Sequence, residues 1–203
     1  VKVRENLDEG FKKTNQTFQN VIERLAKIDE AQKKIESLST NVISLQDVLT
    51  DKKARGVFGE VQLKQILSSV FGEQNDKVFQ LQYALSNDKV VDAALFLPDP
   101  IGTLCVDSKF PLENYKRMVD RSLSEEERKA ISKEFVKNVK KHIDDIARKY
   151  ILAGETANQA ILFLPAEAIF AEIHAYYPEV IDYANQNRVW ITSPTTFLAT
   201  LTT

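Results

Sequence analysis

The fold of this chain depends on one stretch, residues 89–110, which reads KVVDAALFLPDPIGTLCVDSKF. Both ends of the stretch are mainly apolar and contain β-branched residues, which predicts strands at 89–97 and 103–110. The segment 98–102 between them holds two prolines and a glycine, a composition typical of a turn. The stretch therefore predicts two neighbouring antiparallel strands.

Ionisable residues occur in both predicted strands, and the length of the turn determines how they face one another. If the turn holds an even number of residues, Leu97 pairs with Gly102 and Asp92 lies opposite Asp107. Lys109 then shares their face, because side chains alternate along a strand. An odd turn would bury a carboxylate in the apolar layer on the other face, so we favour the even register.

Asp92 and Asp107 in direct opposition would repel each other unless a proton or a cation lies between them. Hard oxygen ligands with few imidazoles nearby suit Mg²⁺ or Mn²⁺ better than zinc. An ammonium such as that of Lys109 could orient an attacking water or stabilise charge on a phosphate. The spacing thus indicates a site for metal-assisted phosphodiester hydrolysis. The alternative is that Asp107 and Lys109 merely end a strand in solvent.

The rest of the chain after residue 53 alternates between helix and strand patterns. Ser124 and Glu127 form a capping box that opens the longest of these helices. Helices are predicted at 58–71, 124–152, 167–177, 179–187 and from 194 onward, and further strands at 78–85, 159–164 and 188–192. This mixture predicts an α/β or α+β domain.

Residues 1–50 have a different character, with no proline, a single glycine and apolar residues at alternating steps of three and four. A narrow apolar seam with balanced charges on its flanks favours a coiled coil, and we assign residues 1–53 to it. The alternative is a helix folded back on the domain. We expect the coiled coil to make the chain a homo-oligomer. We expect no membrane contact, because the polar face is not rich in Lys and Arg.

The composition excludes several classes of protein. The 203 residues have a formal net charge of −2, so the chain is not a globally basic nucleic-acid binder. The single cysteine, Cys105, excludes a disulfide scaffold and fits a reducing compartment, so we expect a cytoplasmic protein. The chain starts at Val1 and stops in what reads as an unfinished helix. We therefore expect it to be a piece of a longer protein, truncated at its C-terminus.

Five separated sequence words make the chain similar to the RmuC family of DNA recombination proteins. In chain order they are GVFGE at 56–60, VD at 91–92 leading to LP at 97–98, VDSKFPL at 106–112, FLPAE at 163–167 and SPTT at 193–196. Asp92 followed by Asp107-Ser108-Lys109 also resembles the PD-(D/E)XK nuclease core. The resemblance covers roughly residues 54–203. Val91 departs from the proline that usually precedes the first aspartate in that wider superfamily.

This resemblance implies a fold and a function. Residues 54–203 would form a restriction-endonuclease-like (PD-(D/E)XK) mixed sheet flanked by helices, an α/β domain preceded by a long coiled-coil helix. Its partner would be DNA, and its activity that of a Mg²⁺- or Mn²⁺-dependent nuclease in DNA recombination, limiting rearrangement at repeats. Members that carry an N-terminal membrane anchor have it in a segment absent here. The alternative is a catalytically silent DNA-binding or scaffold protein with a nuclease fold.

The resemblance also assigns roles to single residues. Asp92 and Asp107 would be metal ligands, Lys109 the catalytic lysine, and Glu60 a catalytic acid from the preceding helix that reaches a water or a second metal. Glu60 could equally be a first-turn glutamate favoured by the helix dipole. Glu167 follows an apolar strand, where it could lie in a second shell around the site or cap the following helix.

The helix predicted at 124–152 carries the chain's one concentration of basic residues. Its lysines could lie along DNA phosphates, although a solvated helix face is the simpler interpretation. No aromatic residues are interleaved with them, which gives base stacking little support. His142, in the same helix, and His174 are interpreted as packing residues. The candidate DNA-binding residues are Lys129, Lys133, Lys137, Lys140 and Lys141.

Overall fold

The computed structural model describes residues 52–73, 76–120 and 122–202. The chain divides into two units, Val1–Leu45 and Gln46–Thr203, and every described residue belongs to the second. The coiled coil predicted for residues 1–53 therefore lies almost wholly outside the described residues. Within the described ranges, no helix is both long and apolar enough to cross a membrane.

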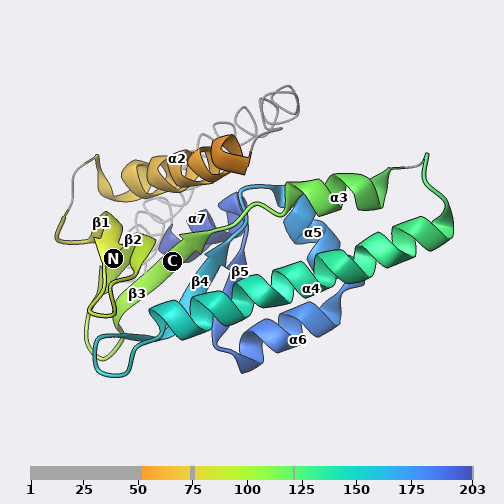
Figure 1. The fold of residues 1–203 in the computed structure, drawn as a ribbon. Coiled ribbons are helices and arrows are strands. Elements are labelled where there is room, and N and C mark those ends of the chain that lie inside the picture. The colour runs from red at the N-terminus through yellow and green to blue at the C-terminus, as the bar shows by residue number, and fades with distance from the viewer. Residues whose placement is uncertain (1–51, 74–75, 121, 203) are drawn as a thin grey trace, which may run out of the picture. The chain divides into compact units, whose positions relative to one another are not determined.

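The described elements follow the predicted order of helices and strands, with one addition (Figure 1). They are α2 (Lys52–Phe71), β1 (Phe79–Ala84), β2 (Val90–Leu97), β3 (Gly102–Ser108), α3 (Leu112–Val119), α4 (Glu125–Tyr150), β4 (Thr156–Phe163), α5 (Glu167–Tyr176), α6 (Pro178–Gln186), β5 (Val189–Thr192) and α7 (Pro194–Thr202). The capping box of Ser124 and Glu127 at the start of α4 is confirmed.

Helix α3 was not predicted from the sequence, and α2 begins six residues earlier than the predicted start at residue 58. Only Leu112 and Met118 of α3 are buried, and its N-cap, Pro111, makes no side-chain capping bond. With eight residues and no capping signature, α3 is too short for its apolar spacing to distinguish a helix from a loop in the sequence. In α2, Gly56 and Gly59 interrupt the first two turns and hide the helix pattern.

The five strands form one mixed sheet in the order β1-β2-β3-β4-β5. Strands β1, β2 and β3 are antiparallel neighbours, whereas β3, β4 and β5 run parallel. Leu97 pairs with Gly102 and Ala93 with Val106, so the even register is confirmed. The α/β fold with a mixed sheet flanked by helices is likewise confirmed.

Helices cover both faces of the sheet. Helices α2 and α7 pack on one face, where Leu63, Leu67 and Phe197 meet Ala93 and Val106 in one buried cluster. Helix α4 crosses the other face and contacts β4 and β5 (Figure 1). The six buried residues of α4 recur with helical spacing: Ile131, Phe135, Val139, Ile143, Ile146 and Tyr150. Alternation therefore directs Val106 toward α2 and its neighbour Asp107 toward α4.

Gly59 lets α2 approach the end of β3 closely. A Cβ atom at this position would overlap Ser108 Oγ and lie 3.4 Å from Pro165 Cγ and from Ser108 Cβ. Gly56, one turn earlier in the same helix, has open space where its Cβ would be. The two glycines thus differ in what surrounds them, and only at Gly59 would a side chain force a neighbour, the Ser108 hydroxyl, to move.

Gly59→Ala is expected to lower the free energy of unfolding by about 1–3 kcal/mol, because the added methyl group overpacks this contact. In a Ser108→Ala background the overlap disappears, and the same change should become neutral or stabilising by up to about 1 kcal/mol, the helix-propensity gain over glycine. Urea unfolding of the four proteins of this double-mutant cycle measures the coupling. Gly56→Ala is the control and should stabilise α2. If the effects of Gly59→Ala and Ser108→Ala on the free energy of unfolding are additive, the close approach of α2 to Ser108 is contradicted.

Candidate active site

The candidate site lies at the sheet edge where β3, β4 and β5 end. Ser108 pairs with Phe163, and Phe163 with Thr192, so the carboxyl ends of the three parallel strands are level. Strand β2 runs antiparallel to β3 and begins at this edge. The loops that follow the parallel strands, the start of β2 and the first half of α2 therefore converge here. They contain four of the five sequence words and the VD of the remaining one, whose LP lies at the far end of β2. Open α/β sheets bind ligands at the carboxyl ends of their strands.

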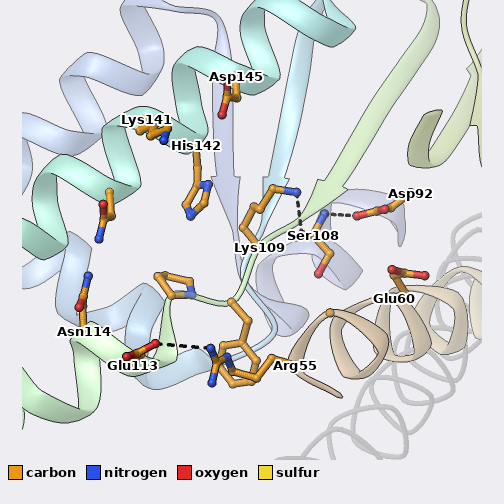
Figure 2. Close-up of a pocket in the computed structure, with 14 residues that line it drawn as sticks. Arg55, Glu60, Asp92, Ser108, Lys109, Glu113, Asn114, Lys141, His142 and Asp145 are labelled. Carbon is orange, nitrogen blue, oxygen red and sulfur yellow. Dashed lines mark hydrogen bonds and ion pairs between the residues drawn. The ribbon is translucent and has the colours of Figure 1, made fainter. Parts of the chain in front are cut away.

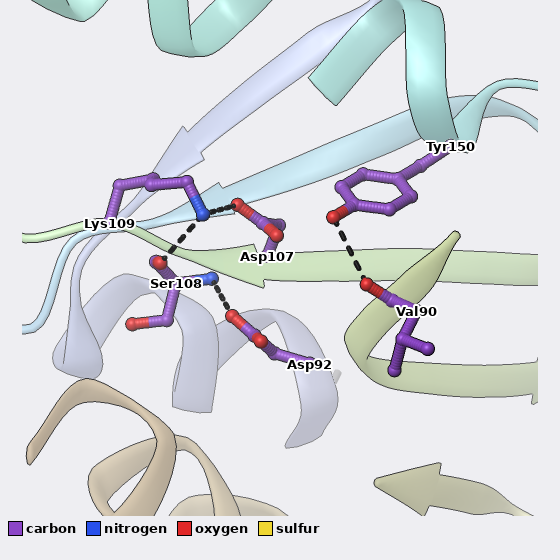
Figure 3. Close-up of polar contacts among 6 residues, drawn as sticks. All are labelled: Val90, Asp92, Asp107, Ser108, Lys109 and Tyr150. Atoms are coloured by element: carbon purple, nitrogen blue, oxygen red, sulfur yellow. Dashed lines mark hydrogen bonds and ion pairs between the residues drawn. The ribbon is translucent and has the colours of Figure 1, made fainter. Parts of the chain in front are cut away.

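Asp92, Asp107 and Lys109 come together at this edge (Figure 3). The Asp107 side chain is only 3% exposed, and Lys109 Nζ lies 2.5 Å from its Oδ2 as an ion pair. Lys109 Nζ also donates to the Ser108 carbonyl at 3.3 Å, and the Ser108 amide donates to Asp92 Oδ2 at 2.7 Å. The Lys109 ammonium is thus the partner of the buried Asp107 Oδ2, for which no further hydrogen-bond partner is found among the described residues.

The electrostatics of the pair are those of two carboxylates that share one site. The pKa of Asp92 is raised from 3.8 to about 6, mainly by burial and next by the charge of Asp107. The Ser108 amide and the Lys109 ammonium act in the opposite direction, and the charge of Glu60 adds a smaller upward contribution. One lysine therefore compensates this acidic site only in part, and a further cation would be favoured there.

Tyr150, from the last turn of α4, lies near Asp107 on the face of the sheet that α4 covers. Its hydroxyl donates to the Val90 carbonyl at 3.2 Å (Figure 3). Burial raises the pKa of Tyr150, and the nearby Asp107 carboxylate raises it further. Tyr150 was not predicted as a site residue, because it continues the apolar stripe of α4 and its spacing is that of a core residue.

Asp92, Lys109 and Glu60 line one pocket of about 610 Å³ (Figure 2). The pocket extends away from the sheet edge between α3 and α4. Its wall on α4 is formed by residues at i, i+3, i+4 and i+7 spacing, namely Asn138, Lys141, His142 and Asp145. This row adjoins the apolar stripe of the helix, so the packing of α4 on the sheet determines that it faces the pocket.

His142 was interpreted as a packing residue, but it is half-buried and points from α4 into the pocket (Figure 2). Burial lowers the pKa of His142, and the positive charge of Lys109 lowers it further. The imidazole is therefore a neutral hydrogen-bonding group of the pocket wall above neutral pH. His174 lies elsewhere, in α5, where its ring contacts Phe170.

The two further glutamates differ in their surroundings. Glu60 lines the pocket and accepts a hydrogen bond from Gln82 Nε2 at 3.2 Å. Glu167 is not among the residues that line the pocket, and its Oε1 accepts the Thr195 amide at 2.7 Å. Glu167 thus binds the first turn of α7, not the helix that it begins.

The five lysines of α4 are not equivalent. Lys129 forms an ion pair with Glu125 at 2.7 Å, and Lys140 lies over the ring of Tyr183, 5.1 Å from its centroid. The other three lysines, Lys133, Lys137 and Lys141, line a second hollow of about 710 Å³, together with Lys140. Asn138 and Lys141 line both hollows, so the lysine surface is continuous with the candidate site.

Asp92 and Asp107 are the residues at this sheet edge that could hold a divalent cation. Both offer carboxylate oxygens, and the buried Asp107 Oδ2 is paired with the Lys109 ammonium. Nowhere in the described ranges do three or more His, Cys, Asp or Glu side chains form a metal-binding group. A cation held by this pair would keep several water ligands, which suits Mg²⁺ better than zinc.

The fold and the site together define a class: an α/β domain with an acidic pair and a lysine at the carboxyl edge of a mixed sheet. Comparison with known families is more specific. The model of the RmuC family matches residues 1–203, and the chain belongs to this family. Proteins of the family are named DNA recombination proteins.

The relatives that the chain matches carry the same name. It is 31% identical over 194 residues to the DNA recombination protein RmuC homolog of Xylella fastidiosa, covering 91% of this chain and 42% of that protein. It is 29% identical to the homolog of Pasteurella multocida, covering 96% and 40%, and 30% identical to that of Chlamydia muridarum, covering 89% and 40%. The chain thus spans about two fifths of these relatives. No solved structure gave a significant match.

Proposed function

We propose that this chain carries the site of a Mg²⁺- or Mn²⁺-dependent DNA nuclease of restriction-endonuclease-like fold that acts in DNA recombination. The observation that carries the proposal is the convergence of two carboxylates, Asp92 and the buried Asp107, with the Lys109 ammonium at the carboxyl ends of the parallel strands. The name of the relatives, DNA recombination proteins, supports the link to recombination. The mixed sheet, with this set at the end of β3, is what the PD-(D/E)XK resemblance implies.

In this proposal the side chains have distinct roles. Asp92 and Asp107 would hold the cation, which would supply positive charge to the phosphate and lower the pKa of a bound water. Lys109 would stabilise the negative charge that develops on the phosphate oxygens. Glu60 borders the same pocket and would orient a water from the α2 side. Asp92 must be ionised to bind the cation, so occupancy should fall as the pH drops below about 6.

The decisive experiment compares wild type with Asp107→Asn for cleavage of single-stranded, duplex and branched DNA in Mg²⁺ and in Mn²⁺. Wild type should cleave at least one form, and the variant should lose activity by at least about 10²-fold, because a ligand is lost. Mn²⁺ should raise the melting temperature of wild type but not of the variant. Asp182→Asn, an exposed carboxylate on α6, is the control.

Absence of cleavage, with no cation effect on melting, would contradict the nuclease proposal. The same result accompanied by DNA binding would favour the alternative, a catalytically silent DNA-binding or scaffold protein. Self-association through residues 1–53 and a cytoplasmic location stay predictions.

We further propose that DNA leaves the site across the lysine surface of α4. Replacing Lys133, Lys137 and Lys141 by glutamine should weaken DNA binding regardless of sequence and flatten the slope of log affinity against log salt by about one unit per lost phosphate contact. Each exposed change should alter stability by less than about 0.5 kcal/mol. The matched control replaces the exposed Lys64, Lys77 and Lys89. If both triple variants keep the same affinity and slope, the row is only a solvated helix face.

A further inference from the structure

The half of the pocket that lies between α3 and α4 has no role in the proposed hydrolysis. Its wall carries two amide side chains, Asn114 from α3 and Asn138 from α4, and the imidazole of His142. Phe110, from the segment after β3, contributes an aromatic ring to the same pocket. In Figure 2 Asn114 and His142 point into the hollow from the two helices that border it.

The charges around this half of the pocket balance. Arg55 and Glu113 form an ion pair at 3.6 Å, and Lys141 and Asp145 add one charge of each sign. A phosphate subsite would need a surplus of positive charge, and none is present there. The lining therefore suits an uncharged ligand with hydrogen-bonding edges.

A nucleobase has the chemistry that this lining would recognise. An asparagine amide offers one acceptor and two donors, which match the edge of a base. Stacking on an aromatic ring contributes to base binding without regard to sequence. The ring of Phe110 packs against Phe58 at a centroid distance of 6.0 Å, which supports it from one side as a platform. The volume of about 610 Å³ lies within the range of small-molecule sites.

We infer that this half of the pocket holds an unpaired nucleobase of the strand whose phosphate lies at Asp92 and Asp107. A base stacked inside a duplex cannot enter such a pocket, so the substrate class is single-stranded or frayed DNA. The inference rests on the proposed nuclease function for the position of the phosphate. The base-binding step itself needs no cation and no cleavage.

The test measures equilibrium binding of a fluorescent single-stranded dodecamer and of the corresponding blunt duplex to the full chain, in EDTA at low salt. The double variant Asn114→Ala/Asn138→Ala should bind the single strand about tenfold more weakly and the duplex within twofold of wild type. Asn185→Ala, an exposed asparagine on α6, is the matched control and should change neither. Unchanged single-strand affinity, or equal weakening for both forms of DNA, would overturn the inference.

Phe110→Leu gives an independent second variant, because leucine keeps an apolar contact with Phe58 and removes only the aromatic face. It should weaken single-strand binding about fivefold and abolish the fluorescence change of a 2-aminopurine base placed in the strand. A fluorescence change equal to that of wild type would count against the pocket.

The nuclease proposal and the base pocket fail in different ways. If the binding effects are observed but the protein never cleaves DNA, only the nuclease proposal is refuted. If the protein cleaves single strands and internal duplex sites at equal rates, only the base pocket is refuted.

Discussion

Lys109→Ala should slow DNA cleavage by about 10²–10³-fold, the usual cost of removing one group that stabilises transition-state charge. The Lys109 ammonium lies beside Asp107, where the phosphate would sit, and within the described residues it is the cation bound directly to the acidic pair. The loss should appear in kcat and kcat/KM together, because the interaction develops in the transition state. Single-turnover cleavage in Mg²⁺ measures it.

Two controls accompany this variant. Lys109→Ala leaves Asp107 buried without its counter-charge, so the fold is less stable and the assay must run well below the melting temperature. Lys64→Ala removes an exposed lysine of α2 and should cleave like wild type. If folded Lys109→Ala protein retains the wild-type rate, Lys109 is a structural partner of Asp107 and has no catalytic role.

Asp92→Asn should make the cation-free protein more stable at pH 8, although it removes a site residue. The pKa of Asp92 is about 6 in the folded chain against 3.8 for the unfolded reference, so the folded state holds this proton more tightly. Tighter proton binding by Asp92 stabilises the folded state. This contribution is complete below pH 3.8 and is lost as the pH rises through about 6. Above that pH the buried charge destabilises the wild type, while asparagine can still accept the Ser108 amide.

Asp92→Asn should raise the free energy of unfolding at pH 8 by about 1–2 kcal/mol. This is below the roughly 3 kcal/mol that the full pKa shift of Asp92 implies, because the carboxyl is partly solvated. Denaturant unfolding in EDTA at pH 4, 6 and 8 measures it, with Asp182→Asn as the control. The gain should be absent at pH 4. Added Mn²⁺ should stabilise wild type and leave Asp92→Asn unchanged. A variant less stable than wild type at pH 8 would contradict the cost of burying the ionised Asp92 carboxylate beside Asp107.

The strands, most helices and the register between β2 and β3 could be predicted because they depend on local rules. An even turn at 98–101 and the alternation of side chains suffice to put Asp92 and Asp107 on one face of the sheet. The capping box at Ser124 and the apolar stripe of α4 are equally local signals. The candidate pair beside Lys109 was therefore accessible from the sequence alone.

The pocket around that pair was decided only by the tertiary structure. Phe110, Asn114 and His142 line one pocket because of the connection between β3 and β4. This connection contains α3 and α4, and α4 packs across the sheet. No spacing along the chain encodes that approach. The sequence pattern predicts that Tyr150 is a core residue and that Glu167 could cap its own helix. Only the packing of α4 over Val90 and of α7 beside Glu167 determines what these two side chains contact. Local periodicity determines which face a side chain occupies, whereas long-range packing of helices on the sheet determines what it meets there.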